Sequence, residues 1–249
     1  MNILETQHLT HIFANGTVAV DDINLAIREG EFIVIAGANG SGKTVLVRHF
    51  NGLLLPTKGR VLLEGKPIVK DLVDARKKIG LIFQNADSQI VGQTVAEDVA
   101  FGPENLNLSR SEVESRVKEA LEAVGLSAFA NYQPYALSGG LKRKLAVAGV
   151  LAMKPRIIIF DEPFTGLDYP GGIQVLKQLV ALNGNGHTII LVTHELEKVL
   201  AHANRLLIME KGRLVEDDKP ERLIAKLEDY GIKKPYGYNR KVETMSWLS

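Results

Sequence analysis

The sequence predicts an α/β fold with a mostly parallel sheet, and three observations support that prediction. Short apolar runs at residues 31–36, 156–160 and 187–193 have the length and composition of buried strands. Stretches with helical spacing occur between such runs, and strands that alternate with helices form parallel sheets covered on both faces. A glycine-rich loop follows the first run and leads into a helix. The 249 residues are enough for one large domain with an inserted lobe.

The composition is that of an ordinary soluble globular protein. Hydrophobic residues make up 45% of the chain and charged residues 24%. The formal net charge of +1 predicts no general attraction to nucleic acid or anionic lipid. The absence of cysteine excludes disulfides, thiolate metal sites and cysteine nucleophiles, and is compatible with a reducing cytoplasm. The apolar runs are far too short to span a membrane, and the N-terminus has neither a basic leader nor a signal core.

The chain begins with sequence typical of antiparallel strands. Residues 3–9 and 20–27 alternate apolar and polar side chains, and residues 14–17 are predicted to form the turn between them. Further strands are expected at residues 60–65 and 79–83. We therefore expect an antiparallel β subdomain at the N-terminus.

A mostly helical lobe is predicted at about residues 85–150, inserted between the sheet-forming parts of the chain. Ser109 and Glu112 match a capping box at the start of a helix. Apolar residues then recur at helical spacing until Gly125 ends the run.

The sheet-forming sequence resumes after this lobe. Strands are expected at residues 156–160, 187–193 and 205–209, and helices at residues 170–182 and 195–203. A short amphipathic helix is expected at residues 221–228. The chain is thus interpreted as a main domain at residues 1–220, followed by a short C-terminal helix and tail at residues 221–249.

The glycine-rich loop fits the phosphate-binding pattern G-x-x-x-x-G-K-[ST]. Its residues are Gly37, Ala38, Asn39, Gly40, Ser41, Gly42, Lys43 and Thr44. Glycines let the backbone N–H groups turn toward a polyphosphate, because no Cβ blocks them, and the helix N-terminus adds partial positive charge. Lys43 is expected to bind the outer phosphates of a nucleotide, and the Thr44 hydroxyl is expected to ligate Mg²⁺.

Two carboxylates follow the apolar run at residues 157–160. Asp161 is expected to complete the Mg²⁺ site opposite Thr44, usually through water. Glu162 is then placed to accept a proton from the water that attacks the γ-phosphate. Alone, this pair could be a solvated acidic turn; together with the phosphate-binding loop, the catalytic interpretation is favoured.

Ser138, Gly139 and Gly140 precede a helical run and predict a second anion site. Ser138 is a suitable N-cap, and the glycines expose the first N–H groups of the helix. An isolated Ser-Gly-Gly would more simply be an ordinary N-cap. The three histidines between residues 187 and 202 lack the spacing and partners of a zinc site, so we reject one.

Together these motifs resemble those of ATP-binding cassette (ABC) ATPases over about residues 1–220, and they occur in the order of that family. Phe13 takes the place of the aromatic that stacks on adenine, residues 37–44 match Walker A, Gln84 matches the Q-loop, residues 137–140 match the signature motif, Asp161 and Glu162 match Walker B, residues 166–168 match the D-loop, and His194 matches the switch histidine.

The resemblance implies a P-loop NTPase (RecA-like) fold with an N-terminal antiparallel β subdomain and an inserted α-helical subdomain. It also implies that two cassettes, identical or different, pair head to tail around ATP. Phe13, residues 37–44 and Val45 would bind ATP in one cassette, and Ser138, Gly139, Gly140 and Asp168 of the other would cover it. Glu162, His194 and Gln84 are the implied catalytic residues, and Thr44, Gln84 and Asp161 are the implied Mg²⁺ ligands.

The segment at residues 80–106 resembles more narrowly the ATPases of energy-coupling factor (ECF) transporters and the related cobalt importers. This resemblance implies a peripheral subunit on the cytoplasmic face of the cell membrane, beneath a membrane T-component and a substrate-capturing S-component. Such a subunit powers the import of a vitamin or a metal ion. The sequence departs from the family pattern at Ala86 (Pro expected), Val45 (Thr common) and Leu141 (Gln usual).

Several alternatives remain open. A cassette of another importer or of an exporter is disfavoured by the segment at residues 83–106. A soluble ABC protein of translation or DNA repair usually has two cassettes, a long coiled-coil insertion or basic patches, and the sequence shows none of these. No nucleic-acid partner is therefore expected. A regulatory pseudo-ATPase is disfavoured by intact Lys43, Asp161, Glu162 and His194.

Overall fold

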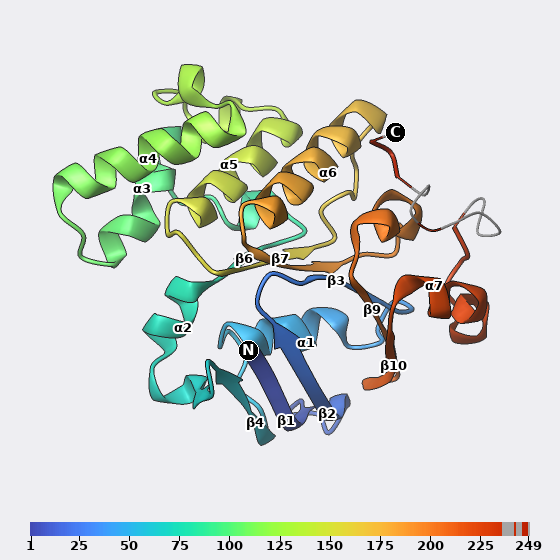
Figure 1. The fold of residues 1–249 in the computed structure, drawn as a ribbon. Helices are drawn as coiled ribbons and strands as arrows, with labels where there is room; N and C mark the ends of the chain where they lie inside the picture. The colour runs from blue at the N-terminus through green and yellow to red at the C-terminus, as the bar shows by residue number, and fades with distance from the viewer. Residues whose placement is uncertain (236–241, 243–245, 249) are drawn as a thin grey trace.

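A six-stranded sheet forms the centre of the molecule (Figure 1). The structure is a computed structural model, and it describes residues 1–235, 242 and 246–248. The strand order is β10-β9-β3-β8-β7-β6. The bounds are β3 Phe32–Ala36, β6 Ile79–Ile82, β7 Ile157–Asp161, β8 Thr188–Val192, β9 Arg205–Glu210 and β10 Arg213–Asp218. Neighbouring strands run parallel except β10 and β9. The predicted α/β fold with a mostly parallel sheet is confirmed.

A second, antiparallel sheet has the strand order β2-β1-β4-β5. Its strands are β1 Asn2–Ile12, β2 Val18–Arg28, β4 Lys58–Leu63 and β5 Lys66–Pro67. Helix α1, Lys43–Phe50, lies between this sheet and the central one (Figure 1). The predicted antiparallel strands at the N-terminus are confirmed, although β1 and β2 extend beyond the predicted ranges.

The section between β6 and β7 is mostly helical, as predicted. Its helices α3 Val95–Asn105, α4 Arg110–Val124 and α5 Gly139–Leu151 pack against one another (Figure 1). Short 3₁₀ turns join them: η2 Ala86–Ser88, η3 Ser127–Phe129 and η4 Pro134–Ala136. Before β6, the turn η1 Ile68–Lys70 and the helix α2 Leu72–Lys78 were not predicted.

The predicted capping box at Ser109 forms only in part. Ser109 Oγ accepts a hydrogen bond from the Glu112 backbone N–H at 3.3 Å, but the Glu112 carboxylate accepts one from Arg116 Nε at 2.7 Å. A complete box occurs at the start of α3 instead, where Thr94 and Glu97 each cap the other's backbone N–H. Arg116, one turn further along α4, thus binds the Glu112 carboxylate that was predicted to cap the start of the helix.

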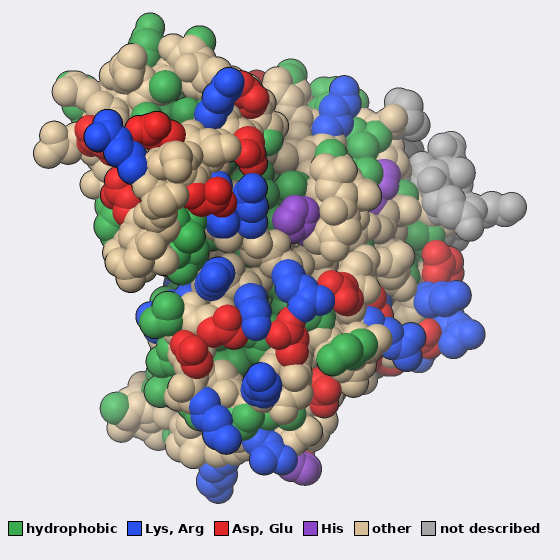
Figure 2. All heavy atoms as spheres, turned by 60° about the vertical axis from the view of Figure 1, so that its left-hand side comes forward, with side chains coloured by type: hydrophobic (Ala, Val, Ile, Leu, Met, Phe, Trp, Pro, Cys, Tyr) green, Lys and Arg blue, Asp and Glu red, His purple; other side chains and the backbone are tan. Residues whose placement is uncertain are grey.

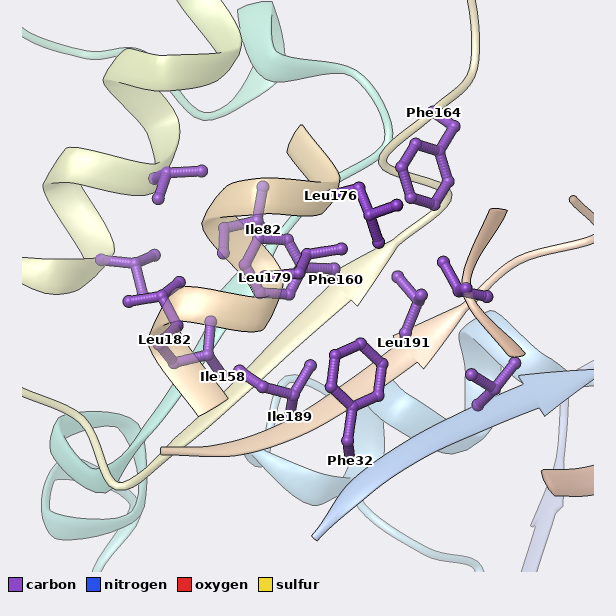
Figure 3. Close-up of a cluster of buried hydrophobic side chains, with 14 of the residues drawn as sticks. Phe32, Ile82, Ile158, Phe160, Phe164, Leu176, Leu179, Leu182, Ile189 and Leu191 are labelled. Atoms are coloured by element: carbon purple, nitrogen blue, oxygen red, sulfur yellow. The ribbon is translucent and has the colours of Figure 1, made fainter. Parts of the chain in front are cut away.

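Side chains of the central strands alternate between two hydrophobic cores, one on each face of the sheet. On one face, Phe32 and Phe160 share a core with Leu176 and Leu179 of α6, Tyr169–Gly184, and Figure 3 shows Phe160 beside Leu179. On the other face, the alternate residues pack against α1 and the antiparallel sheet. Burial on both faces explains why the strands appear in the sequence as continuous apolar runs.

The prediction of a helix at residues 195–203 is wrong. Two 3₁₀ turns stand in its place, η5 Leu196–Lys198 and η6 Leu200–His202. Val199 separates them with φ −127° and ψ −21°, outside α-helical values. Leu196, Val199 and Leu200 are all buried. The helix-like apolar spacing reflects their burial in the core rather than a continuous helix.

The C-terminal part also differs from the prediction. The strand β10, which pairs at the edge of the sheet, was not predicted. The single helix expected at residues 221–228 is replaced by α7 Pro220–Leu223 and the 3₁₀ segment η7 Ile224–Tyr230. Most of the tail after residue 235 lies outside the described residues. Within the described part of the chain, no helix has the length and apolar character needed to cross a membrane.

Candidate functional site

The carboxyl ends of neighbouring parallel strands bring the predicted site residues to one edge of the central sheet. The loop at residues 37–44 follows β3, His194 follows β8, Asp161 ends β7, and Gln84 follows β6. In open α/β sheets, ligands bind in the crevice outside these carboxyl ends. The topology thus collects in one place residues that are widely separated in the sequence.

Two glycines allow the phosphate-binding loop to fold closely against the rest of the chain. A Cβ atom at Gly37 would lie 2.3 Å from the carbonyl oxygen of Met209, and one at Gly42 would lie 2.4 Å from that of Ala19. Gly42 also has φ 100° and is the N-cap of α1, which begins at Lys43. Any side chain at these positions would displace the loop from the helix N-terminus that gives it positive charge.

Lys43 is only 7% exposed, and its ammonium group lies inside this loop. Its Nζ donates hydrogen bonds to the carbonyl oxygens of Gly37 at 2.8 Å and Ala38 at 3.0 Å. Burial lowers the pKa of Lys43, and the carboxylates of Glu162 and Asp161 oppose that shift. The loop therefore holds a cation in position for a charge-assisted hydrogen bond to a phosphate group.

Thr44 and Asp161 offer oxygen donors that fit a Mg²⁺ ion. Thr44 Oγ1 donates to Asp161 Oδ1 at 3.2 Å. Burial raises the pKa of Asp161, and the nearby Glu162 adds to this shift. A cation bound beside Asp161 would oppose the shift and favour the charged form of the Asp161 carboxyl. Within the described residues, no group of three His, Asp or Glu side chains could hold a metal ion. The arrangement suits Mg²⁺, which takes one or two carboxylates and fills its other positions with phosphate and water.

Glu162 is held in a strained backbone conformation beside His194. Its φ of 52° lies in the left-handed region, which residues other than glycine seldom adopt. Its backbone N–H donates to the Val192 carbonyl at 2.9 Å. The carboxylate Oε2 lies 2.9 Å from Nδ1 of His194. A sheltered carboxylate oriented by an imidazole is suited to take a proton from a water molecule.

A cleft of about 450 Å³ lies over these groups. Its lining residues are Phe13, Thr17, Val18, Ala19, Asn39, Gly40, Gly42, Lys43, Thr44, Val45, Gln84, Glu162, Thr165 and His194. This volume is within the usual range of small-molecule sites, about 300–1,000 Å³. Phe13 packs against the ring of His11 at 5.0 Å, edge to face, which holds it at the cleft wall. The predicted ATP, Mg²⁺ and catalytic residues are therefore together in or directly beside one cleft.

A larger hollow of about 820 Å³ adjoins the phosphate-binding loop on another side. It shares Asn39 and His194 with the cleft, but Lys43 and Thr44 do not line it, and residues 231–235 form part of its wall. Because only the smaller cleft is lined by the Lys43 ammonium and the Thr44 hydroxyl at the start of α1, we assign the nucleotide to that cleft.

The residues predicted to cover a partner's ATP do not line the cleft. Residues 138–140 and Asp168 are exposed, and none of them is among its lining residues. Ser138 Oγ caps α5 by accepting from the Leu141 N–H at 3.4 Å, and Asp168 caps α6 by accepting from the Gly171 N–H at 2.9 Å. Within one chain Ser138 and Asp168 thus act as helix caps, and residues 138–140 and Asp168 are exposed to another molecule.

Leu141, where glutamine is usual in the family, is half-buried and packs against the helical core. We expect Leu141→Gln to raise ATP hydrolysis by several-fold at most, because one added hydrogen bond contributes about 0.5–1.5 kcal/mol. The same change should lower the melting temperature, because it removes apolar packing. Steady-state ATPase rates and thermal melts of both proteins would measure these effects. A lower melting temperature with an unchanged rate would show that Leu141 serves packing alone.

Sequence reasoning missed Arg143, which joins α5 to two of the site loops. Its Nη1 donates to the Pro163 carbonyl at 2.7 Å, and its Nη2 donates to Thr165 at 3.1 Å and Gln84 at 3.5 Å. Burial lowers the pKa of the Arg143 guanidinium. The guanidinium thus fixes the loop after Glu162 relative to the helix that carries Ser138. Its partners are backbone carbonyls, which no residue type in the sequence reveals. The cleft residues Thr17, Val18, Ala19 and Thr165 were also missed, because none of them belongs to the motifs recognised in the sequence.

Known proteins are similar to this chain in sequence and in fold. A family model described as ABC transporter matches residues 20–165. The chain is 47% identical over 231 residues to the energy-coupling factor transporter ATP-binding protein EcfA of Methanocaldococcus jannaschii, which covers 92% of this chain and 83% of that protein. The structure of cbiO1 from Clostridium perfringens, described as part of the ABC transporter complex cbiONQ, matches with a TM-score of 0.82 and 37% identity over 92% of each chain. A dimeric ATP-binding cassette in a post-hydrolysis state bound to ADP and Pi matches with a TM-score of 0.77 and 31% identity, over 87% of this chain and 98% of that one.

Proposed function

The chain belongs to the ABC transporter family of ATP-binding proteins, and on that premise we propose that it is the ATPase subunit of an ECF-type importer. Its activity as a member of that family is ATP hydrolysis coupled to transport. The observation that carries the proposal is the site itself: Glu162 lies 2.9 Å from His194 in the cleft that also holds Lys43 and Thr44. The identity to a protein named as an energy-coupling factor ATPase supports the ECF type over other importers and exporters.

We propose a role for each part of the cleft. The adenine of ATP stacks on Phe13, and its phosphates lie along residues 37–44 and the backbone of Val45. Thr44, Asp161 and Gln84 hold Mg²⁺, which neutralises phosphate charge when bound. Glu162 accepts a proton from the attacking water, and His194 orients the Glu162 carboxylate and contacts the γ-phosphate.

The proposed partner in hydrolysis is a second ABC ATPase, either another copy of this chain or a different one. Ser138, Gly139, Gly140 and Asp168 of each chain cover the ATP bound by the other. These residues are exposed and do not line the chain's own cleft, which supports this arrangement. The similar solved cassette is a dimer, which also supports it.

The proposed location is peripheral, on the cytoplasmic face of the cell membrane. There the pair works beneath a membrane T-component and an S-component that captures a vitamin or a metal ion. A relative described as part of the complex cbiONQ supports a multi-subunit assembly. On the face shown in Figure 2, Lys and Arg side chains are interspersed with Asp and Glu. This face therefore does not form the continuous basic patch that is typical of nucleic-acid binding.

Purification of the tagged chain from detergent-solubilised membranes of its own cells tests this proposal. We expect polytopic membrane subunits and a second ATPase chain to co-purify. The complex in vesicles should take up a vitamin or metal ion with ATP, and a matched complex carrying Glu162→Gln should not. Recovery of the chain without membrane subunits, together with salt-sensitive binding to RNA or DNA, would instead favour a soluble ABC protein. ATP-driven efflux would favour an exporter.

A further inference from the structure

Lys198, four residues after His194, carries a buried ammonium group. Its side chain is only 7% exposed, and it forms an ion pair with Glu195. Its Nζ also lies 4.5 Å from the ring centroid of Trp247 and 5.1 Å from that of Phe164. Removing an ammonium group from water is costly unless partners compensate, and an aromatic ring face does so in part, tryptophan best of all.

The partners of Lys198 come from separate segments of the site. Glu195 directly follows His194, so its ion pair with Lys198 fixes the turn that presents the histidine. Phe164 lies two residues after Glu162 and is fully buried. Lys198 therefore contacts the segments that carry the two groups proposed to act on the attacking water.

Trp247 extends this set of contacts to the start of α6. Its ring lies 4.9 Å from the ring of Tyr169, the residue after Asp168. A Cβ atom at Gly172 would come within 3.1 Å of the Trp247 ring, so the two segments pack closely. Ser246 Oγ and His202 Nε2, 2.8 Å apart, hold the adjoining backbone. Figure 1 shows the C-terminal end of the chain beside α6.

We infer that Lys198 and Trp247 are positioning residues that join the His194 segment to the Asp168 turn. The contacts run from Glu195 through the Lys198 ammonium to the Trp247 ring, and from that ring to Tyr169. A partner chain that contacts Asp168 would therefore also act, through these contacts, on the segment that holds His194 beside Glu162. This inference rests on the proposed roles of His194, Glu162 and Asp168.

Two pairs of variants test the inference in the full-length chain. Trp247→Ala and Lys198→Met remove the contacts, and Trp247→Phe and Lys198→Arg restore a ring or a charge. We expect the first pair to lower kcat by about tenfold, with KM for ATP within about twofold, because small misplacements of catalytic groups act on turnover. The second pair should recover most of the rate. Leu248→Ala is the matched control, since it removes apolar packing from the same segment while leaving the Trp247 ring in place.

The chain has a single tryptophan, so its fluorescence reports on Trp247 alone. We expect its emission to change on addition of ATP and Mg²⁺ in Glu162→Gln, where turnover is blocked, and the same addition to leave the emission of Lys43→Ala Glu162→Gln unchanged. This measurement needs no turnover, so it tests the inference even if transport activity is never found. An emission that ATP leaves unchanged in Glu162→Gln would overturn the inference. Losses of kcat in Trp247→Ala no larger than those in Leu248→Ala would also overturn it, because the contacts would then be structural only.

Discussion

Glu162→Gln is expected to lower steady-state ATP hydrolysis by about 100-fold to 10,000-fold, the range that a general base contributes. Glutamine keeps the shape of the side chain and its contact with His194 at 2.9 Å, but it cannot accept a proton from water. ATP binding should persist, because Lys43 and the loop at residues 37–44 are unchanged. Colorimetric phosphate release and equilibrium ATP binding would measure the two quantities separately.

The same variant should accumulate as an ATP-held pair of chains. ATP favours the closed pair over the separate chains, and a chain that cannot hydrolyse ATP does not reopen by turnover. Size-exclusion chromatography with ATP and Mg²⁺ should show the shift, and it should be absent without nucleotide. Glu221→Gln, an exposed carboxylate outside the cleft, is the control and should behave as wild type. Near-normal turnover in Glu162→Gln would show that the base lies elsewhere.

The parts of this molecule that were predicted correctly are those encoded in neighbouring residues. The phosphate-binding loop was recognised because its glycines, Lys43 and Thr44 are adjacent in the sequence and lie between an apolar run and a helix. The strands of the central sheet were recognised because burial on both faces requires continuous apolar runs. Asp161 and Glu162 were expected beside the loop because they directly follow an apolar run in a chain that also has a phosphate-binding loop, and the structure places them there.

The missed features depend on contacts between distant residues. The apolar spacing at residues 195–203 is compatible with a helix, but burial of Leu196, Val199 and Leu200 in the core is satisfied by two 3₁₀ turns instead. In the sequence, Arg143 and Lys198 are indistinguishable from other basic residues. Only the fold shows that Lys198 is buried between aromatic rings and that Arg143, which is partly buried, binds backbone carbonyls of the site loops. Propensity and periodicity describe local preference, which tertiary packing overrides.

Lys43→Ala is expected to weaken ATP binding by about 100-fold and to remove most ATP-dependent association of the chains. A hydrogen bond to a charged group contributes about 1.5–3 kcal/mol, and each 1.4 kcal/mol changes a binding constant about tenfold. The structure adds a second reason. Lys43 is the buried cation that opposes the carboxylates of Asp161 and Glu162, and burial already raises the pKa of Asp161. Without the ammonium, these carboxylates repel both each other and an incoming phosphate.

Titration of a fluorescent ATP analogue and light scattering with ATP would measure binding and association in turn. Lys211→Ala is the matched control, because that lysine side chain is 90% exposed and should leave both quantities unchanged. Adding Asp161→Asn to Lys43→Ala separates the two reasons. If electrostatic repulsion contributes, the double variant should bind the analogue in the absence of Mg²⁺ more tightly than Lys43→Ala does, since one carboxylate has been neutralised. ATP-dependent association that persists undiminished in Lys43→Ala would contradict an interface bridged by phosphate, and pairing would then have to arise from protein contacts alone.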